Sequence, residues 1–148
     1  ITERKEQERR LRLLESVIVN ANDAVVITEA EPVEPPGPKI IYVNEAFTGM
    51  LGYTPEEVIG KTPRILQGPK TDWNVLKEIR TALKEWKPAI AELVNYHKDG
   101  SEVWIELSIF PVTDQTGHYT YWVGLQREIT HRKEAEVEMQ KALAKERE

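Results

Sequence analysis

Residues 60–68, GKTPRILQG, carry two side chains that could contact one bound molecule. Arg64 and Gln67 are three residues apart, a spacing that lets a guanidinium and an amide reach the same ligand. Pro63 stands directly before Arg64, where a reactive side chain would be expected, and it offers no nucleophile. The stretch therefore predicts non-covalent contact with a ligand at this loop.

Two further amides stand in segments with the two-residue period of β-strands. Asn95 lies in residues 89–97 and Gln126 in residues 118–129. By this pattern both side chains lie on adjacent parts of one sheet. Amides on an inward face need hydrogen-bond partners, so a ligand or a water network is favoured over exposure to solvent.

The composition excludes several kinds of site. The 148 residues include no cysteine, which removes disulfides, thiolate metal sites and a cysteine nucleophile. The three histidines are too scattered for a metal cluster, and no nucleophile elbow or phosphate loop is present. We expect no metal and no catalysis by this chain itself.

Charge and hydropathy restrict the partners. The net charge of −5 argues against nucleic acid, whose phosphates would be repelled. No apolar run approaches the ~20 residues that cross a bilayer, and no signal peptide opens the sequence. We expect no membrane contact and a cytoplasmic location.

The elements that must position these side chains follow from periodicity and turn signals. Asn44 and Thr54 each precede a short predicted helix, and Asp72 precedes a longer one that ends before Pro88. Residues 29–39 hold four prolines and form a loop. The predicted strands are residues 24–28, 39–43, 89–97, 102–112 and 118–129. This order predicts an α+β fold in which a five-stranded antiparallel sheet has helices on one face.

The two ends of the chain resemble each other. Residues 1–8, ITERKEQE, match residues 129–136, ITHRKEAE, at most positions. We therefore expect a similar domain to precede this one in a tandem array. The predicted organisation is an N-terminal linker helix at 1–20, a domain at 21–130 and a C-terminal signalling helix at 131–148. Short apolar stripes on both helices predict a homodimer, and a solvated connector helix is the alternative.

Several segments, in this order, resemble a PAS domain, a sensory α+β module, over residues 20–135. They are IIYVNEAFTGMLGYTPEEVIGK, NYHKDGSEVWIEL and WVGLQREIT. The nearest subgroup is that of the flavin-binding light-oxygen-voltage (LOV) domains, whose motif G-x-N-C-R-F-L-Q-G is similar to GKTPRILQG. The resemblance implies that five residues hold flavin mononucleotide (FMN): Arg64, Gln67 and Arg80 at its phosphate-bearing tail, and Asn95 and Gln126 at its ring.

Three positions of this sequence differ from the pattern of the LOV subgroup. Pro63 stands in place of the photoactive cysteine, and Thr62 in place of the motif asparagine. Adduct formation needs a sulfur, so LOV-type photochemistry is excluded. Ile105 stands in place of a second ring-binding asparagine, which would leave the flavin edge partly unpaired at a cost of about 1–3 kcal/mol. FMN, another small ligand and no ligand therefore all stay open.

The predicted site residues also have local explanations. The alternatives are ion pairs of Arg64 with Glu56 or Glu57, ion pairs of Arg80 with Asp72 or Glu85, and capping of the turn before GPKTD by Gln67. The four tryptophans are expected to be packing residues.

Three functions remain. The first is a sensory module of a larger protein, with a neighbouring PAS domain and an output domain such as a histidine kinase or a cyclic-nucleotide enzyme. In it, Gln126 would couple a ligand to the exit helix through residues 127–130. The second is FMN binding without an adduct, and the third is a ligand-free spacer in a tandem array.

Overall fold

The computed structural model describes residues 3–5 and 22–147. Most of the predicted N-terminal helix, and its part in a dimer, therefore lie outside the described residues. The strands are β1 (Ala24–Glu29), β2 (Ile40–Val43), β3 (Ala89–Tyr96), β4 (Glu102–Thr113) and β5 (Tyr119–Glu128). The helices are α2 (Glu45–Leu51), α3 (Pro55–Val58), the 3-10 helix η1 (Pro63–Leu66), α4 (Trp73–Lys84) and α5 (Thr130–Glu146).

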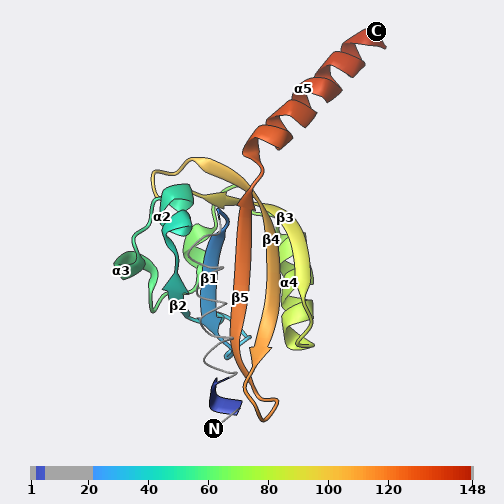
Figure 1. The fold of residues 1–148 in the computed structure, drawn as a ribbon. Coiled ribbons are helices and arrows are strands. Elements are labelled where there is room, and N and C mark those ends of the chain that lie inside the picture. Colours follow the sequence, from blue (N-terminus) through green and yellow to red (C-terminus); the bar gives the residue numbers. More distant parts are fainter. Residues whose placement is uncertain (1–2, 6–21, 148) are drawn as a thin grey trace.

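The five strands form one sheet in the order β2-β1-β5-β4-β3. Every neighbouring pair is antiparallel, and β5 lies in the centre between β1 and β4. Helix α2 packs against β1, and α4 packs against β3 (Figure 1). The predicted α+β fold, an antiparallel sheet with helices on one face, is confirmed.

The caps predicted from the sequence start the helices. Asn44 Oδ1 accepts a hydrogen bond from Phe47 N at 3.1 Å and another from Val25 N at 2.9 Å, so this cap also ties α2 to β1. Asp72 Oδ1 accepts from the backbone N–H groups of the first turn of α4. Gly52 ends α2 with a φ of 80°, and a Cβ at this glycine would lie 2.4 Å from the ring of His97.

Helix α4 ends earlier than the sequence predicted. Trp86 adopts a φ of 55°, and Lys87 N donates to Ala82 O at 3.0 Å, which closes the helix in a Schellman motif. Pro88 therefore does not end the helix. Trp86 stacks on Tyr119 with ring centroids 4.4 Å apart and on Trp122 at 5.2 Å. These two stacking contacts hold a bulky residue in a conformation that favours glycine.

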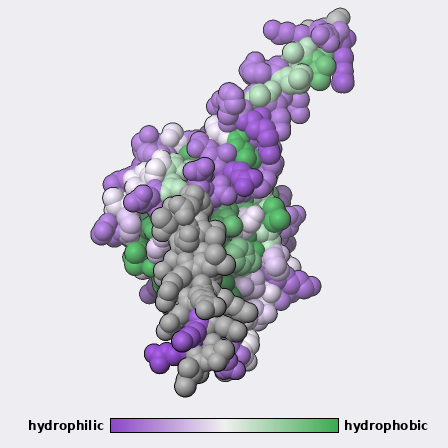
Figure 2. Space-filling view, in the orientation of Figure 1, coloured by the Kyte–Doolittle hydropathy of each residue, from purple (hydrophilic) through white to green (hydrophobic). Residues whose placement is uncertain are grey.

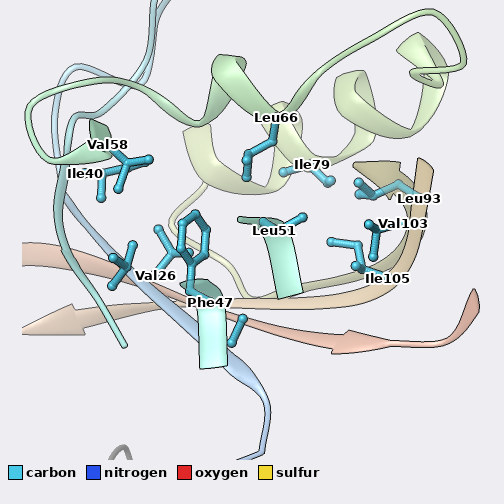
Figure 3. Close-up of a cluster of buried hydrophobic side chains, with 12 residues drawn as sticks. Val26, Ile40, Phe47, Leu51, Val58, Leu66, Ile79, Leu93, Val103 and Ile105 are labelled. Atoms are coloured by element: carbon cyan, nitrogen blue, oxygen red, sulfur yellow. The ribbon is translucent and has the colours of Figure 1, made fainter. Parts of the chain in front are cut away.

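The core lies between the sheet and the helices (Figure 3). Phe47 and Leu51 of α2, Leu66 of η1 and Ile79 of α4 meet side chains from the strands. Ile105 of β4 is fully buried in this cluster. The apolar positions of α4, spaced at three and four residues, therefore face the sheet as their period predicted.

Helix α5 projects from the end of β5, away from the sheet (Figure 1). None of its residues is buried, and Figure 2 shows it as largely hydrophilic with hydrophobic residues scattered along it. Among the described residues, no helix is long and apolar enough to cross a membrane.

Candidate functional site

A cavity of about 150 Å³ lies between the inner face of the sheet and the helices. Three of the five predicted site residues line it: Gln67, Asn95 and Gln126. The lining includes no charged side chain, and Thr28 is its one further polar residue. The other lining residues are apolar, and they include Leu76, Leu83, Leu93, Leu107 and Trp122.

The two strand amides bind each other. Asn95 Nδ2 donates to Gln126 Oε1 at 3.2 Å, and the two residues are only 7% and 4% exposed. Asn95 pairs with Val103 of β4, and Gln126 pairs with Leu107 of the same strand. Ile105 is the inward residue of β4 between these two pairs, so the amides reach across it. Both amides face inward, as predicted, and each has the other as its hydrogen-bond partner.

Gln67 reaches the cavity from the helix side. It follows η1 directly, its backbone N–H donates to Arg64 O at 3.1 Å, and its side chain is half-buried. Among the described residues, the Gln67 side chain forms no hydrogen bond that would cap the turn before GPKTD. Thr71 Oγ1 accepts from Gly68 N at 2.8 Å, and Tyr96 Oη accepts from Lys70 N at 2.7 Å. These bonds leave the Gln67 amide at the cavity wall.

The two predicted phosphate-binding arginines lie outside the cavity. Arg64 of η1 and Arg80 of α4 are both exposed, and neither lines it. Within the described part of the chain they also form none of the ion pairs considered above. Glu57 pairs with Lys98, which holds the pKa of that carboxyl at about 2, and Glu85 pairs with Lys87 at 3.0 Å. Both guanidiniums thus face solvent on the helix side of the domain.

Strand β5 connects the cavity to helix α5. Trp122, Gly124 and Gln126 line the cavity from alternate positions of this strand, and α5 begins at Thr130. Ile129 N donates to Trp104 O at 2.8 Å, and Thr130 Oγ1 accepts from Trp104 N at 3.0 Å. The start of α5 is therefore hydrogen-bonded to β4.

Charged groups hold the first turn of α5 to the sheet. Lys133 Nζ lies 2.8 Å from Glu92 Oε1 of β3 and 5.1 Å from the centre of the Trp104 ring. Arg132 also pairs with Glu92. The hydrogen bond from Lys133, followed by that from Arg132, lowers the pKa of Glu92, and the bond to Glu92 raises the pKa of Lys133. Sequence reasoning missed Glu92 because its partners stand forty residues away.

Sequence reasoning also missed several lining residues. Thr28, Trp122 and Gly124 occupy inward strand positions. Trp122 and Gly124 alternate with Gln126 along β5, so the two-residue period from Gln126 would have found them. Among the described residues, no cluster of three or more histidine, aspartate or glutamate side chains could hold a metal ion.

Comparison with known proteins decides the family. The sequence model of the PAS domain matches residues 22–131. The chain belongs to the PAS domain family. This PAS domain is 38% identical over 135 residues to the bacterioopsin transcriptional activator of Halobacterium salinarum, covering 91% of this chain and 19% of that protein. It is 39% identical over 119 residues to a blue-light photoreceptor of Listeria innocua, covering 80% of this chain and 46% of that protein.

Two further proteins are similar to this domain. A blue-light-activated histidine kinase of Erythrobacter litoralis is 33% identical over 106 residues, covering 72% of this chain and 29% of the kinase. A solved light-oxygen-voltage domain studied with a flavin analogue superimposes with a TM-score of 0.73 at 29% identity, covering 88% of this chain and 95% of that one. The PAS domain spans less than half the length of these curated relatives. It is a sensory domain that resembles the LOV subgroup and has Pro63 in place of the photoactive cysteine.

The site fits a flavin nucleotide only in part. Gln67, Asn95 and Gln126 line one cavity, which agrees with the resemblance to the LOV subgroup. The volume of about 150 Å³ is well below the ~300–1,000 Å³ of typical ligand sites. Ile105 is fully buried in the core and offers no hydrogen bond to a ring edge. The polar residues suit a ring edge, whereas the space does not suit three fused rings with a sugar-phosphate tail.

Proposed function

We propose that this PAS domain senses a small molecule in the cavity and relays its presence to an output domain through β5 and α5. The observation that carries this proposal is the continuity of β5, which supplies Trp122, Gly124 and Gln126 to the cavity and enters α5 two residues after it ends. When the side chain of Gln126 changes its hydrogen-bond partner, the change acts on backbone that leads directly into Thr130.

The relay needs two arrangements that a ligand favours unequally. In the structure, Gln126 Oε1 accepts from Asn95. A ligand that binds either amide competes with this bond and so changes the hydrogen bonding of β3 and β5. Both strands also contact the first turn of α5, β5 by continuity and β3 through Glu92. The same two strands therefore bound the cavity and hold the exit helix.

The relatives support a wider role. They include a transcriptional activator and a blue-light-activated histidine kinase, and the match covers a minor part of each. We propose that the domain belongs to a multidomain cytoplasmic sensor with a neighbouring PAS domain. Its output would be a histidine kinase or another signalling enzyme, and α5 would pair with its copy in a homodimer.

A cavity-filling substitution tests the relay. A leucine at position 124 would extend into the cavity, because a Cβ there meets only Leu107 Cδ1 at 3.6 Å and Val26 O at 3.7 Å. Val123 is the neighbouring position on the opposite face of β5. We expect Gly124→Leu to change amide hydrogen exchange in the first two turns of α5, and Val123→Leu to leave it unchanged. Equal exchange in both variants would contradict the relay.

FMN binding without an adduct is the second candidate. The blue-light photoreceptor relatives favour it, as does the meeting of Gln67, Asn95 and Gln126 at one cavity. Arg64 and Arg80 would then hold the phosphate outside the cavity, at the protein surface. Protein purified after expression with added riboflavin would be yellow and show the blue-light absorption band of an oxidised flavin. A colourless preparation would remove this candidate.

A further inference from the structure

The cavity restricts the chemistry of its occupant more narrowly than membership of the family does. Its volume of about 150 Å³ equals that of an engineered protein cavity that accepts benzene. A flavin or a nucleotide exceeds it, whereas one ring, or two fused rings with modest movement of the leucine side chains, suits it. In the arrangement of side chains seen here, the space therefore suits one or two rings better than three.

The lining excludes charge on the occupant. None of the residues at the cavity is ionisable, and the nearest predicted cationic groups, Arg64 and Arg80, are exposed and do not line it. A carboxylate or a phosphate in this cavity would lose its hydration without gaining a counter-ion. The part of the occupant that lies inside the cavity is therefore neutral.

Two strand amides in the wall of the cavity offer hydrogen bonds. The bond between Asn95 Nδ2 and Gln126 Oε1 uses one proton of the first amide and one acceptor position of the second. Asn95 Oδ1 can still accept a hydrogen bond from a ligand, and Gln126 Nε2 can still donate one. The ring of Trp122 and the leucines form the remaining walls. A mainly apolar molecule with one polar edge matches this arrangement.

We infer that the ligand of this PAS domain is a neutral molecule of one or two rings, largely apolar, with a single hydrogen-bonding group such as the N–H of indole or the hydroxyl of a phenol. The inference rests on the proposed sensory function and departs from the flavin candidate. It assigns Asn95 and Gln126 to the polar group and Trp122, Leu93 and Leu107 to the rings.

Matched probes test this inference on the intact chain. Indole is neutral, indole-3-carboxylate differs from it by one charged group, and FMN exceeds the cavity. Titrations are followed by calorimetry and by the side-chain amide NMR signals of Asn95 and Gln126. We expect saturable indole binding that shifts both amide signals, with at least tenfold weaker binding of the carboxylate and no binding of FMN.

Variants place the probe in the cavity. Gly124→Leu should weaken indole binding at least tenfold and Gly124→Ala by a smaller factor, whereas Val123→Leu should bind as the wild type does. The smaller alanine substitution keeps the comparison valid if leucine prevents folding. Binding that Gly124→Ala and Gly124→Leu both leave unchanged would place indole elsewhere and overturn the inference.

Two further outcomes would also overturn it. FMN binding that shifts the two amide signals would show that the cavity opens for three rings, and the sensory function would survive with a different ligand. Failure of the folded protein to bind indole would reject the ligand class. The proposed relay has its own test, hydrogen exchange of α5 in Gly124→Leu, which needs no ligand, so the two failures are distinguishable.

Discussion

Lys133 and Glu92 join the exit helix to the edge of the sheet, with Nζ and Oε1 2.8 Å apart. Glu92 belongs to β3, the strand that also carries Asn95. The pair is partly exposed, so its contribution to stability is small and is screened by salt. The pair affects the direction of α5, because together with the hydrogen bonds of Trp104 it holds the first turn of the helix to the sheet.

This junction predicts a pH dependence. Since the pKa of Glu92 is lowered in the folded protein, its contribution is present above the ordinary carboxyl pKa and is lost as the pH falls through the lowered value. The raised pKa of Lys133 acts at the other end, where the contribution is lost only in strong alkali. We expect amide protection in the first turn of α5 to fall in acid, as measured by hydrogen exchange.

The control for this prediction removes the carboxylate. Glu92→Gln should lower the protection of the first turn at neutral pH and flatten its dependence on acid. A variant with the same acid-dependent loss as the wild type would show that another group controls the junction.

The amide pair predicts coupling between two buried residues. Gln126→Leu leaves Asn95 with an unpaired buried amide, which should cost about 1–3 kcal/mol in the free energy of unfolding. Asn95→Leu should cost a similar amount. The double variant should lose less than the sum of the two, as measured by urea unfolding. Additive losses would mean that the two amides do not stabilise each other.

The end of α4 predicts an unusual order of stability at one position. Trp86→Ala loses both stacking contacts and keeps a side chain at a φ of 55°. Trp86→Gly loses the same contacts and relieves the backbone strain. We expect the glycine variant to be more stable than the alanine variant by about 1 kcal/mol in urea unfolding. The reverse order would place the end of the helix elsewhere.

The cavity predicts that a small addition is tolerated. A methyl group at position 124 meets its nearest neighbours at ordinary contact distances, and Gly124 is not in the left-handed region. Gly124→Ala should therefore raise the free energy of unfolding by about 0.5–1 kcal/mol, because it restricts the unfolded chain. Thermal unfolding measures the change, and a lower midpoint would indicate that the site is already filled by side chains.

The exposed exit helix predicts self-association. Ala135, Met139 and Ala142 are spaced at four and three residues, and Met139 is 64% exposed. We expect a dimer in light scattering at high concentration. Met139→Lys should shift it toward the monomer, whereas Gln140→Lys should not, because Gln140 lies off this stripe. A wild-type protein that is monomeric throughout would contradict the dimer.

Much of the fold was accessible from the sequence because local signals and tertiary structure agree. Asn44, Asp72 and Gly52 cap helices in the structure as their positions predicted. The two-residue period of residues 89–128 predicted three paired strands, and it correctly placed Asn95 and Gln126 inward. These features depend on near neighbours along the chain, which a single sequence displays.

The features that sequence reasoning missed depend on distant partners. The left-handed Trp86 is held by Tyr119 and Trp122, which no local pattern connects to it. Glu92 meets Arg132 and Lys133 only after β3 and β5 have been placed. The predicted partners of Arg64 were close in sequence, whereas Glu57 found Lys98 instead. Proximity along the chain therefore did not identify the partner of Glu57.

Because α5 projects from the domain, a small rotation at its base displaces its far end. A 17-residue helix is about 25 Å long at 1.5 Å per residue, so a tilt of roughly 10° at its base moves its tip by about 4 Å. Its contacts with Trp104 and Glu92 are made by Thr130 and Lys133, which both lie in the first turn of the helix. A rearrangement at the sheet that is too small to alter the core is thereby magnified into a displacement comparable to the rise of a helical turn.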